Sequence, residues 1–416
     1  MISPILQRVE LLLSQSRFPE AKELLQTHLA ENPEDFFAQF YLATIQLQLG
    51  EKQIARQMTE KLLLEEPEAY PVMALAVDVE LADEKLDKAE DLARALMGLY
   101  PLEAGSFLKM ASVKLQQRNY DRALEAANQA LALDPENIDA LNLKIMIGGL
   151  LGNEDTQQAI EEALHIDPES ASTIANHGMQ LLREGKVQQA LERLKYALSL
   201  DPTNSLARYA MAQALKARFW PYRMFLKYGE FSARLSGQSS WAIIIGAYVV
   251  YRILAKVANE YEALAPFLYP IIILIASLFL LTWILEPLMN LYLLSNPYGR
   301  LLLDDDEKKM ARYTGGSLGV ALLSFALYFA LSLETFLMLG VLGVACMIPL
   351  GTFLKPTKSK NRRQLTYFTV AVILSGVVGI LLNQEMLLFG AFFGIFIYQW
   401  IINGIMIKEN ARIFGS

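Results

Sequence analysis

Few residues of this chain have the types and spacing that covalent or metal chemistry needs. It has one cysteine, Cys346, in an apolar stretch, and three widely separated histidines, His28, His165 and His177. One cysteine can neither close an internal disulfide nor build a cysteine zinc site, and no H-E-x-x-H pattern accompanies the histidines. Ser317 lies among glycines in the segment GGSLG, but the second half has no histidine to activate it. We therefore predict no catalytic residue, no metal ligand and no cofactor site, and hence a protein that is not an enzyme.

A run of acidic residues at 304–307 is the remaining candidate for ion chemistry, because carboxylates suit hard divalent cations. Lys308, Lys309 and Arg312 follow it directly. Acidic residues at the start of a short cytoplasmic helix, followed by basic residues, also match the helix dipole, and this is the interpretation that we favour.

Composition divides the chain into two unlike halves. Of its 416 residues 53% are hydrophobic and 19% charged, which is too apolar for a wholly soluble protein. Residues 1–239 carry 24 Lys and Arg against 34 Asp and Glu, a net charge of −10, whereas residues 240–416 have a net charge of +3. We expect an acidic soluble part followed by a membrane part, and the acidic charge disfavours nucleic acid as a partner.

The first half is built from an internal repeat. Prolines recur at intervals of 34, 34, 34, 33 and 34 residues, and similar text surrounds them, as in ALALDPEN at 130–137 and ALSLDPTN at 197–204. Each unit has two amphipathic segments with a turn signal between them, and the proline ends the second segment. The prolines are Pro33, Pro67, Pro101, Pro135, Pro168 and Pro202.

A small residue stands twelve positions before five of these prolines, and Thr156 takes its place before Pro168. The period, this small residue and the terminal proline resemble the tetratricopeptide repeat family. The resemblance covers residues 2–204 and implies six units of two helices that stack into a solenoid. The predicted units are 2–35, 36–69, 70–103, 104–137, 138–170 and 171–204, with a capping helix at 206–218 that completes a domain over 1–218.

The resemblance implies that the first helices of the units line a groove that binds a peptide or helix of a partner protein. One-turn spacing along these helices gives the candidate residues, although inter-repeat core is an equal alternative for the aromatic and methionine members. The candidates are Phe37, Phe40, Thr44, Gln48, Asp78, Leu108, Ser112, Gln116, Asn142 and Met146. The Lys and Asn clamp with which some relatives hold a chaperone carboxylate is not visible at these positions.

The second half contains apolar stretches long enough to cross a hydrocarbon core of about 30 Å. Residues 264–285 carry no charge, and the runs 317–354 and 366–407 are each long enough for a hairpin of two helices. We predict six transmembrane helices within 241–408, forming a polytopic bundle, and a cytoplasmic tail at 409–416. The spans are about 241–258, 264–285, 317–333, 336–354, 366–382 and 386–407.

Basic residues in the connections predict the orientation of these spans. The segments 216–240, 295–316, 355–365 and 408–416 hold 16 Lys and Arg, whereas the alternate turns at 259–263, 334 and 383–385 hold none. Positive charge favours the cytoplasmic side, so both termini and the repeats are expected there, in a plasma or inner membrane. The first unit begins near Met1 and has charges within its apolar stretch, so we expect no secretion signal.

Three charged residues of the membrane part could be functional. Arg252 and Lys256 lie in the outer half of the first span and Glu286 follows the second span. An intramembrane charge is a candidate ion or headgroup site, but interfacial anchoring near Glu260 is the interpretation that we favour for the two cations. Between the halves, residues 219–240 have aromatic residues at helical spacing with basic residues among them, which is typical of a helix in the membrane interface.

Taken together, the sequence predicts an all-α protein with a solenoid that recruits protein partners at the cytoplasmic face of a membrane. A single span would suffice for an anchor, so the bundle could also contact other membrane proteins. The alternative function is a transporter or channel component that is regulated through its repeats. A third class, a membrane enzyme, has no plausible set of residues.

Overall fold

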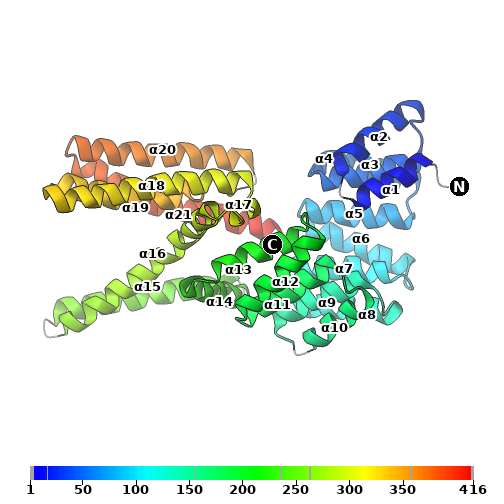
Figure 1. Cartoon of the computed structure of the whole chain (residues 1–416), viewed down its shortest axis with the longest axis horizontal. Coiled ribbons are helices and arrows are strands. Elements are labelled where there is room, and N and C mark those ends of the chain that lie inside the picture. The colour runs from blue at the N-terminus through cyan, green and yellow to red at the C-terminus, as the bar shows by residue number, and fades with distance from the viewer. Residues whose placement is uncertain are drawn as a thin grey trace. The chain divides into compact units, whose positions relative to one another are not determined.

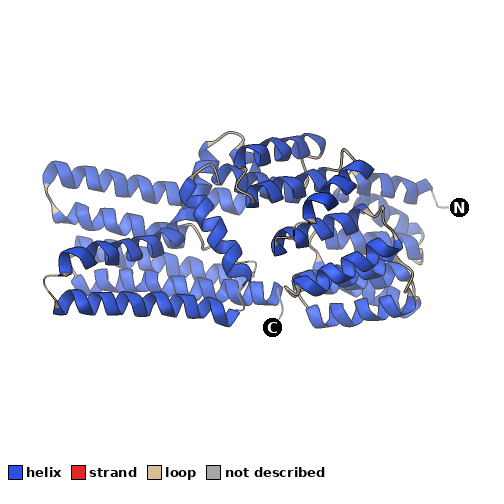
Figure 2. Cartoon of the chain, turned by 90° about the horizontal axis from the view of Figure 1, so that it is seen from below, coloured by secondary structure: helices blue, strands red, loops and turns tan. Residues whose placement is uncertain are grey.

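The computed structural model describes the backbone of residues 4–15, 17–153, 155–234, 237–261, 264–356 and 358–413, and most side chains within these ranges. Among these residues every regular element is a helix, and none is a strand (Figure 2). The all-α prediction is therefore confirmed for the part of the chain that is described.

Helices α1 to α12 form six consecutive pairs that match the predicted six units, and α13 follows as the predicted extra helix (Figure 1). The first helices of the pairs are α1 (Pro4–Ser14), α3 (Phe36–Gln48), α5 (Tyr70–Ala82), α7 (Ala104–Gln116), α9 (Ile138–Leu151) and α11 (Ala171–Arg183). The second helices are α2 (Phe18–Glu31), α4 (Lys52–Glu65), α6 (Leu86–Leu99), α8 (Tyr120–Leu133), α10 (Thr156–Ile166) and α12 (Val187–Leu200), and α13 spans Ser205–Lys216.

After Pro33, Pro135 and Pro202 the side chain two positions later caps the next helix. The Asp35 side chain accepts a hydrogen bond from the backbone N–H of Ala38, and the Asn137 side chain accepts one from the backbone N–H of Ala140. The N···O distance is 3.0 Å in both cases. Asn204 does the same for Ala207 at 2.9 Å. These side chains satisfy N–H groups that have no partner within the first helical turn. The proline ends one helix and the cap begins the next, which fixes the length of the connection.

In units two to six the turn between the two helices has a residue in the left-handed region. Gly50 and Gly185 have φ near +80° there, but Glu84 and Arg118 take the equivalent turns of units three and four with φ of 63° and 57°. A side chain costs free energy in this conformation that glycine does not. Units three and four therefore carry local backbone strain that the glycine-containing units avoid.

The recurring small residue lies where the two helices of a unit approach each other. The alanines Ala21, Ala55, Ala89, Ala123 and Ala190 are all fully buried. In unit five the larger Thr156 is also buried, and it lies opposite Gly148, where an added Cβ would stand 2.5 Å from the threonine hydroxyl. A glycine on the first helix thus compensates for the larger residue on the second.

Successive units are also joined by polar contacts between side chains 24 residues apart, which we call the unit latches. Each latch links a second helix to the first helix of the next unit. Lys22 donates to Gln46 at 3.1 Å, Arg56 pairs with Glu80 at 2.9 Å, and Lys114 pairs with Glu90 at 2.6 Å. The latch positions are equivalent in the repeat, but the sign of the charges is reversed between the second and third latches.

The remaining helices belong to the second half of the chain. They pack around apolar cores, one of which joins Leu342 and Cys346 of α19 to Val372 of α20 and Ala391 of α21. The helices are α14 (Trp220–Arg234), α15 (Gly237–Glu260), α16 (Ala265–Ser295), α17 (Gly299–Leu302), α18 (Asp305–Leu331), α19 (Glu334–Leu350), α20 (Ser359–Leu381) and α21 (Glu385–Ile413).

The acidic run at 304–307 starts α18, as predicted, but the helix that it starts is not a short separate one. Asp304 accepts from the backbone N–H of Glu307 at 2.7 Å, and the Glu307 side chain accepts from the backbone N–H of Asp304 at 3.0 Å. This reciprocal capping box begins a helix that continues through Leu331. The predicted span 317–333 is therefore the later part of a longer helix.

Three helices are long and apolar enough to cross a membrane, namely Asp305–Leu331, Ser359–Leu381 and Glu385–Met406. The helix Glu334–Leu350 is apolar but shorter than these three, with 17 residues. The stretch Ala265–Leu274 of α16 is also a shorter apolar helix. These results concern the described residues, and the predicted spans 241–258 and 264–285 include side chains outside that description. Three spans rather than six are therefore supported, and the count of six stays a prediction.

The chain divides into two compact parts, and the division differs from the expected boundary at residue 218. The first comprises Met1–Gln180, Arg193–Ala207 and Asn410–Ser416, and the second comprises Leu181–Glu192 and Arg208–Glu409. Within the second of these two parts, Ala217, Tyr222 and Leu285 form one buried cluster, against which Leu182 packs. The expected capping helix therefore shares a core with α14 and α16.

Candidate functional site

The first helices of the units form a continuous layer of the solenoid. Helix α3 contacts both α1 and α5, and α7 contacts both α5 and α9. Helices α3, α5, α7 and α9 also each pack against the second helices before and after them. This arrangement makes the first helices the inner layer of a stacked array, with the second helices outside.

Two polar contacts between neighbouring first helices mark one face of this layer. The Tyr41 hydroxyl of α3 donates to the Glu10 carboxylate of α1. The Lys109 ammonium of α7 donates to both carboxylate oxygens of Asp78 on α5, at 2.6 and 2.7 Å. The two contacts use equivalent repeat positions, because partners are 31 residues apart in both. We call the helix surface that carries these contacts the inner face.

Most of the predicted groove residues share a helix face with one of these contacts. Residues at intervals of three, four and seven lie on one side of a helix. Phe37, Thr44 and Gln48 have these intervals from Tyr41, and Ser112 and Gln116 from Lys109. Phe37 is 59% exposed, and Thr44 is partly held by a hydrogen bond to the Phe40 carbonyl at 3.0 Å. Met146 of α9 takes the repeat position of Ser112 and is half-buried.

The other predicted residues are Phe40, Leu108 and Asn142. They stand one repeat position before that of Tyr41 and Lys109, and they turn toward neighbouring helices. Phe40 packs against a core that includes Ala43 and Leu75, and Leu108 packs against a core that includes Ala130. Asn142 accepts a hydrogen bond from the Asn176 amide at 3.1 Å, which links α9 to α11. Phe40 thus packs between repeats, the alternative that the sequence left open for the aromatic residues, and Leu108, expected only in the groove, packs in the same way.

Sequence reasoning missed Glu10, Tyr41 and Lys109, although their side chains define the inner face. Burial, assisted by the nearby Glu10 carboxylate, raises the pKa of Tyr41 to about 12. The hydroxyl therefore stays protonated and acts as the donor at neutral pH. The signal that would have revealed these residues is the spacing of 31 between an acid and a donor on successive first helices.

Two of the three candidate charged residues in the second half of the chain, Lys256 and Glu286, form ion pairs. Lys256 lies 3.7 Å from Glu260, one turn further along α15, and both side chains are exposed. Glu286 of α16 forms an ion pair with Lys355 in the connection after α19. Interfacial anchoring near Glu260 and Glu262 stays a prediction, and Glu262 lies outside the described residues. Arg252 is exposed on α15.

A third cation, Lys216, lies near the Glu286 pair. Its side chain is 3% exposed, and its ammonium stands 5.8 Å from the centre of the Tyr222 ring. Burial lowers the pKa of Lys216, and the carboxylates of Glu286 and Glu307 oppose this effect. A buried ammonium is tolerated where carboxylates and an aromatic face replace water.

Stacked two-helix units with one continuous layer of first helices define a helical repeat protein. Comparison with known families identifies the repeat. The tetratricopeptide repeat model matches residues 6–71 and 108–171, so these two segments of the chain are tetratricopeptide repeats. Such repeats form scaffolds for protein–protein interactions and generally act as non-enzymatic adaptors.

Individual relatives match only part of the chain. A DnaJ homolog subfamily C member 7 homolog of Schizosaccharomyces pombe is 34% identical over 107 residues, which cover 23% of this chain and 22% of the relative. A tetratricopeptide repeat protein from Parabacteroides merdae is 13% identical, with a TM-score of 0.40, over 57% of this chain and 95% of its own. YrrB, described as a TPR protein with an unusual peptide-binding site, is 20% identical, with a TM-score of 0.30, over 45% and 96%.

Proposed function

We propose that the inner face binds a peptide or helical segment of a partner protein and that the second half anchors this scaffold in a membrane, with the repeats on the cytoplasmic side. The observation that carries the first part is the exposed Phe37 beside polar groups on the inner face. An exposed aromatic ring offers apolar contact area, and the surrounding polar side chains can bind a peptide backbone.

The polar residues of the inner face favour a partner segment with its own donors and acceptors. Asp78 and Lys109 are paired, but their side chains remain 39% and 26% exposed, respectively. Gln48 and Gln116 supply amides at the same repeat position, one on α3 and one on α7. A segment that lies across the inner face would meet an aromatic anchor at α3 and polar groups at α5 and α7.

Exposed apolar side chains support the membrane part of the proposal. Phe329 on α18, Leu381 on α20 and Met386 on α21 are 82%, 75% and 86% exposed. Large apolar patches in contact with water are unfavourable, whereas lipid matches them. The three helices of spanning length all contribute such residues, which is the distribution expected for side chains that face lipid.

Helix α14 supports an interfacial location for the segment after the repeats. Trp220 and Met224 are exposed, as are Arg223 and Lys227, and the four residues share one helix face. Tyr222 points to the buried side. An exposed face with an aromatic ring, an apolar chain and two cations suits the headgroup region of a bilayer.

A transporter or channel component was the other function that the sequence allowed. The pairing of Glu286 with Lys355 supports a structural role for the most prominent acidic residue of the membrane part. We therefore propose recruitment rather than transport, without enzymatic activity.

The test is affinity capture with the tagged full chain from detergent-solubilised membranes, followed by mass spectrometry. Phe37→Glu alters the inner face. The matched control is Leu64→Glu, because Leu64 is 84% exposed but lies on the second helix α4. We expect partners that the unchanged chain and the Leu64→Glu variant capture equally and that Phe37→Glu loses. Equal capture by all three proteins would contradict a role for the inner face.

A further inference from the structure

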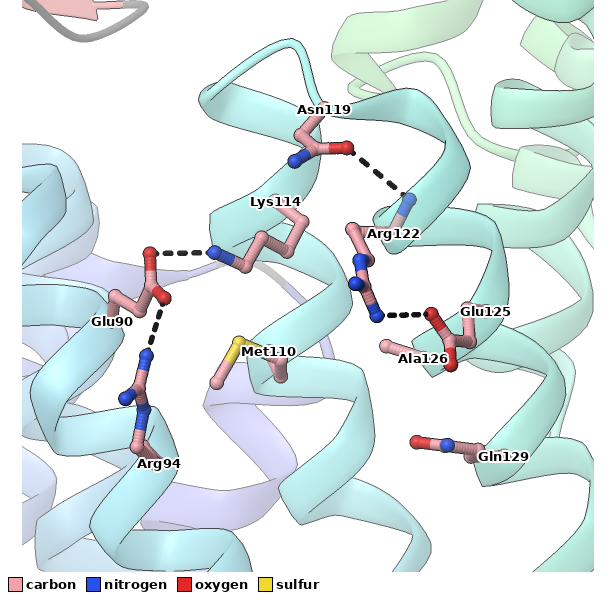
Figure 3. Close-up of a pocket in the computed structure, with 9 residues that line it drawn as sticks. All are labelled: Glu90, Arg94, Met110, Lys114, Asn119, Arg122, Glu125, Ala126 and Gln129. Atoms are coloured by element: carbon pink, nitrogen blue, oxygen red, sulfur yellow. Dashed lines mark hydrogen bonds and ion pairs between the residues drawn. The ribbon is translucent and has the colours of Figure 1, made fainter.

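A pocket of about 430 Å³ lies away from the inner face, between the second helices of units three and four. Helix α6 provides Glu90 and Arg94, α8 provides Arg122 and Glu125, and Met110 and Lys114 of α7 lie between them (Figure 3). The α7 residues in this pocket differ from those on the inner face, where Lys109 of the same helix pairs with Asp78. The pocket therefore opens on a separate surface of the solenoid.

Charges inside the pocket divide into a partly buried ion pair and two exposed cations. The Lys114 ammonium forms an ion pair with one carboxylate oxygen of Glu90 at 2.6 Å, and the amide of Gln117 donates to the same oxygen at 2.7 Å. The Glu90 and Lys114 side chains are 19% and 17% exposed, so this pair forms a partly buried base. The Arg94 and Arg122 side chains are about 70% exposed and stand on opposite walls.

Both arginines keep most of their hydrogen-bonding capacity. Arg94 donates from one nitrogen to Glu90 at 2.8 Å, and Arg122 donates from one nitrogen to Glu125 at 2.9 Å. A guanidinium has five N–H donors in a planar fork that fits a carboxylate. Exposed ion pairs within one helix contribute little free energy, so an incoming carboxylate can replace or share these partners at small cost.

The same location one unit earlier has the opposite charge balance. The positions 34 residues before Arg94 and Lys114 are Glu60 and Glu80, and the position before Arg122 is Lys88. The five charged pocket residues sum to +1, whereas their five counterparts sum to −1. In a half-chain with a net charge of −10, this pocket is therefore a local cationic site.

We propose that the pocket binds a carboxylate of an acidic peptide segment in a partner protein, with Arg94 and Arg122 closing on it from the two walls. Met110 and Ala126, both nearly buried, supply a small apolar surface for a neighbouring aliphatic side chain. This site goes beyond the function proposed for the inner face and would let one solenoid hold two segments at once.

The test measures fluorescence anisotropy of a labelled peptide of alternating leucine and glutamate with the full chain in detergent. A peptide with glutamine in place of glutamate is the ligand control. The double variant Arg94→Gln, Arg122→Gln alters the pocket, and Lys88→Gln removes the equivalent cation of the preceding unit. We expect the double variant to weaken glutamate-peptide binding at least fivefold, Lys88→Gln to leave it within twofold, and the glutamine peptide to bind at least fivefold more weakly.

The inner-face variant Phe37→Glu separates this proposal from the proposed function. Binding of the glutamate peptide should be unaffected by Phe37→Glu if the pocket is the site. The pocket proposal would be overturned if Phe37→Glu lost binding of the glutamate peptide and the double variant Arg94→Gln, Arg122→Gln kept it. Inner-face recruitment would then stay in place. Equal affinity for both peptides, or no binding to the unchanged chain at millimolar peptide, would also overturn it. Circular dichroism of each variant checks that its fold is retained.

Discussion

At the scale of single residues, the left-handed turn inside each unit offers a direct test of backbone strain. Glu84→Gly should raise the free energy of unfolding by about 0.5–1 kcal/mol, because glycine adopts the φ of 63° found there without a clash of its side chain. Denaturant titration followed by circular dichroism measures this change.

The matched change runs in the opposite direction. Gly50→Ala places a side chain at φ of 80° in the equivalent turn of unit two, where an added Cβ has open space. It should lower stability by about 1 kcal/mol from backbone strain alone. If both substitutions destabilised the protein, the strain assigned to Glu84 would be wrong.

Gly178 tests how closely the two helices of unit six approach each other. An added Cβ would stand 2.6 Å from the Cγ of Leu194, so Gly178→Ala should cost about 1–3 kcal/mol through overpacking. Gly98 in α6 has no atom within 4 Å of the same added group. Gly98→Ala should therefore stabilise the protein by up to about 1 kcal/mol through helix propensity. Thermal denaturation of both variants compares them, and equal effects would refute the close approach.

At the scale of elements, the unit latches predict that charge polarity can be exchanged. Lys114→Glu sets two carboxylates against each other and should cost about 2–3 kcal/mol. Adding Glu90→Lys should recover most of that loss, because Arg56 and Glu80 hold the reversed polarity at the equivalent positions. A double-mutant cycle by denaturant titration measures the coupling. A loss in the double variant equal to the sum of both single losses would show that the latch is not an independent pair.

The same latch predicts a dependence of stability on pH. Hydrogen bonds from Lys114 and Gln117 lower the pKa of Glu90 from 4.5 to about 2. The unfolded carboxylate binds its proton at higher pH than the folded one, so the stabilisation is complete above pH 4.5 and disappears as the pH falls toward 2. The difference in unfolding free energy between the unchanged chain and Glu90→Gln should shrink over this range. A constant difference would contradict the assignment.

Much of the solenoid follows from short-range signals in the sequence. The proline and the capping residue two positions later, such as Pro135 and Asn137, fix where one helix stops and the next starts. The inner face was only partly predictable. Phe37 and Phe40 are close in sequence and equally apolar, but helix rotation exposes one and turns the other into the core. The contact of Tyr41 with Glu10 depends on two units together, so no pattern within a single unit reveals it.

At the scale of the whole molecule, the proposed topology can be tested with single cysteines. Cys346 is buried, and Cys346→Ala provides a background without cysteine. In that background Gln384→Cys lies in a turn assigned to the outside and Lys360→Cys in a connection assigned to the cytoplasm, and both positions are exposed. A membrane-impermeant maleimide should label Gln384→Cys in intact cells and Lys360→Cys only after permeabilisation. The reverse pattern would invert the topology.

The membrane part was less predictable than the repeats because hydropathy does not locate helix ends. The charged segment 305–316 has low hydropathy, but its capping box makes it continuous with the apolar residues that follow. The predicted span started at the first residue of the apolar run, whereas the helix begins where the capping side chain first satisfies the backbone N–H groups.

The reversal of charge between the second and third latches has a consequence for how such a chain could change in evolution. Tandem repeats are gained and lost by recombination between similar units. Removal of unit three would bring Arg56 of unit two opposite Lys114 of unit four, so a cation would meet a cation at a partly buried position. Loss of that unit is therefore penalised even though the helices on either side retain the same shape. The reversed order of charges therefore disfavours deletion of unit three in particular.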